Sequence, residues 1–180
     1  MGMISVTLPD GSVNEYTVGI TAGEIIIDIE GRKHDCIAAL VDGKEKDFSS
    51  ELITDCSVEG ISVYSDAGMY ILRHSAAHLL AQAISELYPN AKPTIGPPIE
   101  RGFYYDFADL DDFGSDELKK VQKKMHELAR KNLQIIRIEH TESELSSMFE
   151  NNPYKLEIIK ERIDEGTGST IYSQGDWFDL

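Results

Sequence analysis

The sequence lacks the features that would place the protein in a membrane or in a secretory route. It contains no apolar run of about 18 residues, the length that a helix needs to span a bilayer. Its first residues, MGMISVTLPDG, become polar too early for a secretory signal. We therefore expect a soluble protein of the cytoplasm that makes no contact with membranes.

Cysteine is also scarce, since Cys36 and Cys56 are the only two in the chain. The chain has no second pair of cysteines, and the His34-x-Cys36 spacing is not that of a zinc site. The sequence therefore predicts free thiols in a reducing compartment, and it excludes a fold held together by disulfides.

Basic residues are few, with 17 lysines and arginines against 32 acidic residues and a formal net charge of −15. Such a chain is not drawn to a polyanion by nonspecific attraction. A nucleic-acid partner would need a local basic surface or binding energy from other parts of a longer chain. The one basic cluster fits a solvated helix face and consists of Lys119, Lys120, Lys123, Lys124, Arg130 and Lys131.

The first sixty residues alternate between short strands and turns. Strands at 3–8 and 13–18 flank Pro9-Asp10-Gly11, a strong hairpin signal. Thr21 and Glu24 form a capping-box pattern that opens a short helix ending near Gly31. This order predicts a β-grasp, ubiquitin-like fold with a docking role, because the segment carries no acid–base pair; its further strands are expected at 36–41, 44–47 and 61–64.

A short linker is expected at 65–68, and helical periodicity follows it. Ala77, Leu80, Ala81, Ile84 and Leu87 recur at three- and four-residue steps, which predicts an amphipathic helix stopped by Pro89. The sequence predicts an α+β arrangement over 64–180, in which helices cover an antiparallel sheet. Helices are expected at 73–88, from a cap at Ser115, at 141–149 and at 153–165 until the break at Gly166-Thr167-Gly168, with strands at 103–107, 134–139 and within 169–180.

The stretch RHSAAHLL places His74 and His78 four residues apart on a helix. Residues at i and i+4 share a face, so the two imidazoles can converge on one small volume. Imidazole serves as a neutral zinc ligand or as a general base near neutral pH. Two histidines alone do not make a zinc site, however, and a pair that simply shares a helix face remains an alternative.

Three further segments carry candidate groups. Tyr105 and Asp106 follow a loop rich in proline and glycine, where they offer a phenol and a carboxylate. Lys155 lies in the first turn of a predicted helix, where a lysine opposes the helix dipole and favours an anionic partner. Asp179 ends an aromatic, acidic stretch, WFDL. Each of these residues has a plainer interpretation as an ordinary strand residue or a solubilising charge.

These motifs, in this order, resemble the N-terminal region of threonyl-tRNA synthetases. Residues 1–63, with TLPDG near the start, resemble the TGS-type β-grasp domain of that family. RHSAAHLLAQAI, IGPPIERGFYYD, KKMHELARKN, NPYK and WFDL resemble its editing domain, which would occupy 64–180. The resemblance covers nearly the whole chain, and RHSAAHLL followed by IGPPIERGFYYD carries most of its specificity.

The resemblance implies a ligase that attaches threonine to its tRNA with ATP, and a proofreading region that hydrolyses seryl-tRNA(Thr). It assigns His74, His78 and Lys155 to catalysis, and Tyr105 and Asp179 to binding of the substrate. It implies no metal at this site, although related alanyl-type editing proteins hold zinc with H-x-x-x-H and C-x-x-x-H. The implied partners are the acceptor end of tRNA(Thr) and its seryl-adenosine ester.

One departure from the family pattern bears on activity. The family's C-x-x-x-H motif follows the D-L dipeptide, whereas this sequence stops at Leu180. We therefore expect a truncated editing domain with weak hydrolysis. ATP, Mg²⁺, zinc and a homodimer are expected only for the full-length enzyme. A free-standing alanyl-type deacylase and a non-enzymatic β-grasp module that docks RNA remain alternatives.

Overall fold

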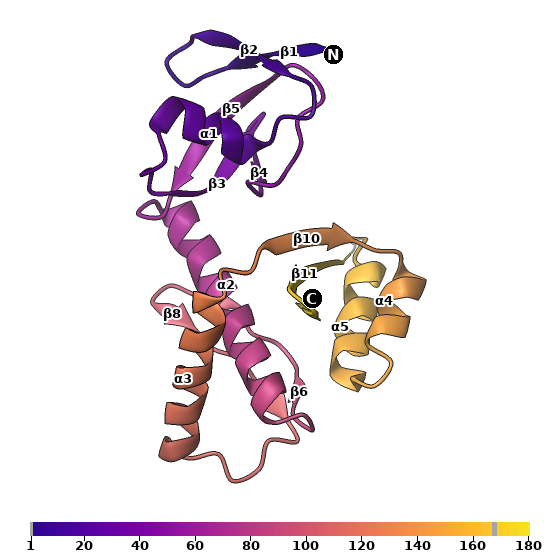
Figure 1. Cartoon of the computed structure of the whole chain (residues 1–180). Coiled ribbons are helices and arrows are strands. Elements are labelled where there is room, and N and C mark those ends of the chain that lie inside the picture. The colour runs from indigo at the N-terminus through magenta and orange to yellow at the C-terminus, as the bar shows by residue number, and fades with distance from the viewer. Residues whose placement is uncertain (1, 167–168) are drawn as a thin grey trace. The chain divides into compact units, whose positions relative to one another are not determined.

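The computed structural model describes residues 2–166 and 169–180, shown in Figure 1. The chain divides into two compact units, Met1–Leu72 and Arg73–Leu180, each of which has its own core. Within the described residues, no helix has the length and apolar character required to cross a membrane.

The first unit is a five-stranded sheet covered on one face by a helix, so the β-grasp prediction is confirmed. The strand order is β2-β1-β5-β3-β4, and β1 runs parallel to β5 while the other pairs are antiparallel. The helix α1 lies in front of the strands in Figure 1. The elements are β1 (Met3–Thr7), β2 (Val13–Thr17), α1 (Ala22–Glu30), β3 (Cys36–Val41), β4 (Lys44–Lys46) and β5 (Cys56–Ser62).

Alternation along the strands explains this core. Ile4 and Val6 of β1 point inward and pack with Ile25 and Ile26 of α1, all of them at most 3% exposed. The predicted capping box is present as well, because the Thr21 hydroxyl accepts from the Glu24 amide while the Glu24 carboxylate accepts from the Thr21 amide. Local turn and cap signals therefore agree with the burial pattern.

The predicted linker at 65–68 is wrong, because this stretch opens a helix. The Ser65 hydroxyl accepts from the Gly68 amide, which is a helix cap, and α2 runs without a break over Asp66–Leu87. A Cβ on Gly68 would lie 2.0 Å from the carbonyl oxygen of Ser62, so this glycine permits close packing rather than flexibility. The strand expected at 61–64 is instead β5, which begins at Cys56 and ends at Ser62.

In the second unit, helices cover an antiparallel sheet, as the sequence predicts. Its larger sheet has the order β10-β11-β12, and two pairs of very short strands, β6 with β9 and β7 with β8, join the chain between α2 and α3. The elements are β6 (Lys92–Pro93), β7 (Pro98–Ile99), β8 (Gly102–Phe103), β9 (Phe107–Ala108), α3 (Ser115–Arg130), β10 (Ile135–Glu139), α4 (Glu142–Met148), α5 (Pro153–Asp164), β11 (Thr170–Gln174) and β12 (Trp177–Asp179).

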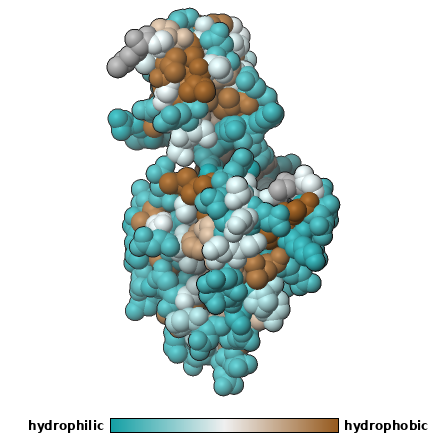
Figure 2. Space-filling model, turned by 90° about the vertical axis from the view of Figure 1, so that its right-hand side faces the viewer, coloured by the Kyte–Doolittle hydropathy of each residue, from teal (hydrophilic) through white to brown (hydrophobic). Residues whose placement is uncertain are grey.

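Two separate apolar clusters hold this unit together. Ile84 of α2 packs with Val121 and Leu128 of α3, and the partly buried Met125 lies against the same cluster. Leu145 of α4 and Ile159 of α5 pack on one face of the β11–β12 hairpin. In the view of Figure 2, hydrophilic residues cover most of this unit, and its hydrophobic residues form separate small patches.

Some element boundaries differ from the prediction. The strand expected at 103–107 is split between β8 and β9, and Gly114 rather than Ser115 caps α3, because the Gly114 amide donates to the Glu117 carboxylate. Helix α5 ends at Asp164, and residues 167 and 168 of the predicted break lie outside the described residues. A capping box formed by Thr141 and Glu144 opens α4.

Cys36 should react far more slowly with iodoacetamide than Cys56. Burial and the neighbouring Glu30 carboxylate, which accepts a hydrogen bond from the thiol, raise the pKa of Cys36 to about 12. Thiolate is the reactive form, and Cys56 is less buried. Peptide mass spectrometry over a time course should show Cys56 labelled first, with equal rates in denaturant. Equal labelling rates in the folded chain would contradict this description of the Cys36 environment.

Candidate functional site

The five residues proposed from the sequence converge within the second unit, although they come from four distant segments. His74 and His78 lie one turn apart on α2, and Tyr105 lies between β8 and β9. Lys155 is in the first turn of α5, and Asp179 is the last residue of β12. The structure thus brings all five into one connected set of contacts.

A buried ion pair forms the centre of this set. The Lys155 ammonium lies 2.6 Å from Oδ1 of Asp179, and the two side chains are 3% and 2% exposed. The Lys155 ammonium also donates to the Tyr105 hydroxyl at 2.9 Å, and that hydroxyl donates to Oδ2 of Asp179. Each charge therefore has a partner, which a charge removed from water requires.

The two histidines extend this network along α2. Their Nε2 atoms are 3.1 Å apart, and Nδ1 of His78 lies 3.4 Å from Oδ2 of Asp179. The carboxylate favours a proton on Nδ1 of His78, which leaves its Nε2 free to accept from Nε2–H of His74. In that tautomer, Nδ1 of His74 carries the lone pair at the end of an Asp–His–His chain, as a proton acceptor requires.

Burial and charge set the protonation of these groups. Burial, reinforced by the neighbouring His78, lowers the pKa of His74 to about 4, so His74 is neutral at pH 7. Burial and the negative charge of Asp179 raise the pKa of Tyr105, which stays a neutral phenol.

The ion pair itself combines opposing effects. Burial lowers the pKa of Lys155 despite its acidic partner, which brings the amine closer to losing its proton. Burial alone would raise the pKa of Asp179, but the contact with His78 and the charge of Lys155 hold it below its ordinary value. A carboxylate that stays charged beside an amine of reduced basicity is an arrangement suited to acid–base chemistry.

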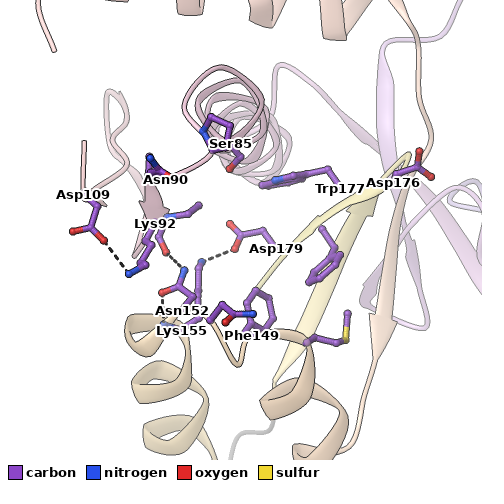
Figure 3. Close-up of a pocket in the computed structure, with 16 residues that line it drawn as sticks. Ser85, Asn90, Lys92, Asp109, Phe149, Asn152, Lys155, Asp176, Trp177 and Asp179 are labelled. Carbon is purple, nitrogen blue, oxygen red and sulfur yellow. Dashed lines mark hydrogen bonds and ion pairs between the residues drawn. The ribbon is translucent and has the colours of Figure 1, made fainter. Parts of the chain in front are cut away.

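A cavity of about 660 Å³ opens beside the ion pair. Figure 3 shows Lys155 and Asp179 pointing toward one another in its wall, with Trp177 and Phe149 on either side. Lys92 and Asp109 form an ion pair of 2.9 Å at a further point of the lining. The cavity is large enough for a small organic ligand, and its wall combines aromatic surface with a few charged groups.

Two aromatic residues that sequence reasoning missed complete the surroundings of the histidines. The ring of Tyr172 lies 5.6 Å from that of His74 and 5.5 Å from that of His78, and the ring of Trp177 lies 6.1 Å from that of His78. Tyr172 pairs with Asp179 across β11 and β12, so both project from the same face of the hairpin. Strand alternation anchored at Gly175 would have placed Tyr172 beside Asp179.

Asn152 is a third residue that sequence reasoning missed, and it fixes the position of Lys155. Its side-chain oxygen accepts from the Lys155 amide at 3.3 Å as the cap of α5, and its Nδ2 donates to the Pro93 carbonyl at 2.8 Å. It thus joins β6 to the helix that carries Lys155. The Asn-Pro pair at a helix start was the available signal, because it is a cap signature.

Asp106, a candidate from the same sequence motif, is not brought into the cluster. Its side chain is exposed, and its backbone pairs with Thr94 and Ile95. Among the described residues, the one group of three or more potential metal ligands that lie close together is Glu30, Asp35 and Cys36, in the first unit. In the candidate site His74 and His78 bring two imidazoles together, and two ligands do not make a zinc site.

Comparison with known sequences defines the class of the first unit. A sequence profile of the TGS domain matches residues 4–61, which are those of the β-grasp sheet and its helix. The first unit is therefore a TGS domain, and the chain is a TGS-domain protein with a second, α+β unit.

The whole chain is similar to threonine–tRNA ligases. It is 39% identical over 185 residues to the ligase of Pelodictyon phaeoclathratiforme and 44% identical over 184 residues to that of Pelobacter propionicus, each alignment covering 100% of this chain. The ligase of Rhodospirillum rubrum is 39% identical over 181 residues. The chain spans 28% of the length of these relatives, and by homology it corresponds to the N-terminal region of threonyl-tRNA synthetases.

Replacing Asn152 by alanine should lower the free energy of unfolding of the second unit by about 1 kcal/mol, the usual cost of losing a helix cap. The loss of the bond to Pro93 should add to this cost. Asn151→Ala is the matched control, because Asn151 is exposed and its side chain donates a hydrogen bond to the neighbouring Glu150. The unfolding free energies of the two variants can be measured by urea denaturation, followed by the fluorescence of Trp177, the single tryptophan. Equal values for Asn152→Ala and Asn151→Ala would contradict the role proposed for Asn152.

His74 should make the chain less stable as the pH falls. Its pKa is about 4 in the folded state against an ordinary 6.5, so between these values the unfolded state binds more protons. Above pH 6.5, His74 does not change the free energy of unfolding. As the pH falls from 6.5 to about 4, it lowers the free energy of unfolding more and more. His74→Gln should therefore show a smaller drop in unfolding free energy between about pH 7 and about pH 5 than the unchanged chain. Parallel pH profiles would show that His74 is not desolvated.

Proposed function

We propose that the Arg73–Leu180 unit is the editing region of a threonine–tRNA ligase and hydrolyses the ester of serine wrongly attached to the tRNA for threonine. The observation that carries this proposal is the convergence of His74, His78, Tyr105, Lys155 and Asp179 beside a cavity. The similarity to threonine–tRNA ligases along the whole chain supports it.

Discrimination between serine and threonine gives the physical reason for such a site. The two amino acids differ by one methyl group, and a missing methyl is worth only about 1–3 kcal/mol in a binding pocket. A ligase that selects threonine by fit therefore also accepts serine at a low rate. A second site that admits the smaller product and hydrolyses it removes the error.

Binding of the substrate would begin at Asp179. The amino group of an aminoacyl ester is a cation, and Asp179 is a carboxylate held in its charged form within the cavity wall. Tyr105, a neutral phenol that donates to Asp179, would orient this carboxylate toward the substrate. The aromatic side chains of Trp177 and Phe149 in the same wall would lower the local polarity, which strengthens the attraction between the two charges.

Hydrolysis would use the basic groups on either side of Asp179. A water molecule attacks the ester carbonyl carbon while a base takes one of its protons. The candidate for this base is His74, which is neutral, and the Lys155 ammonium would place the water. The carbonyl then re-forms as the bond from carbon to the ribose oxygen breaks. The ribose oxygen takes a proton from the His74–His78 chain or from solvent, which releases serine and the free hydroxyl of the tRNA.

The remaining features proposed for the whole ligase lie outside this site. The tRNA for threonine is the proposed partner, and the complete enzyme is proposed to join threonine to it as a homodimer that uses ATP, Mg²⁺ and zinc. We assign no residue of this chain to ATP, Mg²⁺ or zinc. The chain's own contribution is the geometry around Asp179.

Two alternatives have less support. A free-standing alanyl-type deacylase would share the H-x-x-x-H chemistry, but a TGS domain at 4–61 favours the ligase. A module that only docks RNA through the TGS domain leaves the buried lysine, aspartate and histidines of the second unit without a role. Burying such groups costs free energy, so their presence favours a chemical function.

Replacing His74 by alanine should slow the hydrolysis of seryl-tRNA(Thr) by about 10²-fold or more, the usual contribution of a positioned acid–base group. Deacylation should be measured with the chain alone and within the complete ligase, where attachment of threonine should remain nearly unchanged. His126→Ala is the control, because His126 is exposed on α3. The proposal fails if His74→Ala leaves deacylation intact, or if hydrolysis and attachment are lost together.

A further inference from the structure

Gly96 lies directly against the ring of Tyr105. A Cβ built on Gly96 would be 2.1 Å from Cδ2, 2.6 Å from Cγ and 2.7 Å from Cε2 of that ring. Atoms that are not bonded do not approach so closely, so no residue other than glycine fits here without a shift of the ring or the backbone. The collision involves Cγ, at the base of the ring, and a simple rotation of the ring does not relieve it.

The ring of Tyr105 has little freedom to move away. Phe107 stacks against it with ring centroids 5.0 Å apart and an interplanar angle of 27°. Its hydroxyl is bonded to Lys155 and Asp179. A shift large enough to admit a methyl group at position 96 would therefore break the hydroxyl contacts or the stacking.

The backbone around Gly96 is fixed as well. The Thr94 amide donates to the Asp106 carbonyl and the Asp106 amide donates to the Ile95 carbonyl, each at 2.9 Å. These two bonds hold the segment that leads into Gly96 against the segment that carries Tyr105. The distance between Gly96 and the ring is thus set by backbone pairing on one side and by the site on the other.

The backbone conformation at position 96 does not explain why this residue is a glycine. Gly102, in the same segment, has φ +143°, where a side chain would be strained, but Gly96 is not among the residues with positive φ. Alanine at position 96 would meet no backbone penalty. The need for glycine is one of space alone.

We propose that Gly96 is a positioning residue for the candidate site: by leaving room for the Tyr105 ring, it sets the hydroxyl between Lys155 and Asp179. The link to hydrolysis rests on the function proposed above, whereas the link to Tyr105 does not. Gly96 touches none of the reacting groups and acts only through the tyrosine.

Gly96→Ala should displace the Tyr105 ring and reduce deacylation of seryl-tRNA(Thr) by about 10²-fold, the usual cost of misplacing a reacting arrangement by about 1 Å. Gly114→Ala is the matched control. Gly114 has φ −125°, and a Cβ there would meet only the carboxylate end of Glu117, at 3.3 Å. The control should keep the activity of the unchanged chain.

The displacement should be measured without substrate, by NMR of chains labelled in the tyrosine rings. The Tyr105 resonance, identified by its loss in Tyr105→Ala, should shift in Gly96→Ala and stay in place in Gly114→Ala. An unshifted resonance overturns the proposal. A shifted resonance in a chain that never deacylates seryl-tRNA would support the positioning role and count against the proposed function, so the two failures are distinguishable.

A second comparison separates positioning from a general loss of stability. In a Tyr105→Ala background the collision is absent, so adding Gly96→Ala should change neither the unfolding free energy nor the residual activity. Losses that simply add would show that Gly96 acts independently of the tyrosine, and would overturn the proposal.

Discussion

The buried ion pair between Lys155 and Asp179 is the constraint on which the second unit depends. Two charges at 3% and 2% exposure are tolerated only because they lie 2.6 Å apart and share the Tyr105 hydroxyl. Removing one partner of such a pair typically costs about 3–5 kcal/mol, since the other charge is left uncompensated. The start of α5, the end of β12 and the segment before β9 must therefore fold together. The contacts that make the site also hold these three segments in place.

The two units differ in how many polar side chains they bury. The described side chains that are both polar or charged and buried are His78, Gln82, Lys155, Gln174 and Asp179, and all five lie in the second unit. The core of the first unit is built from aliphatic residues and a protonated cysteine. Because buried polar groups cost stability, they accumulate where chemistry needs them. The contrast supports the proposal that the chemistry lies in the second unit.

Local signals in the sequence predicted most of the fold. They failed where the same residue type is common both in linkers and at the start of a helix. The hairpin at Asp10 and the capping box at Thr21 follow from local rules, and they are confirmed. Ser65–Gly68 has the composition of a linker, yet it opens α2, because a serine cap and a closely packed glycine look the same as a flexible joint.

The site shows the same limit. The five residues came from motifs and resemblance. Asn152 and Tyr172 had local signals, a cap signature and a tight hairpin, but the contacts of Asn152 with Pro93, of Tyr172 with the histidines and of Gly96 with Tyr105 join segments that are distant or irregular in the sequence. The charge of the chain bears on how such a site would meet its substrate. With 32 acidic and 17 basic residues, the chain offers little attraction for a polyanion. A site tethered to a domain that already holds the tRNA needs little affinity of its own, because tethering supplies an effective concentration in the millimolar range. The proposed editing role of this acidic unit is thus compatible with a tRNA substrate when the rest of a ligase provides the binding, and the geometry around Asp179 would then need only to distinguish one ester from another.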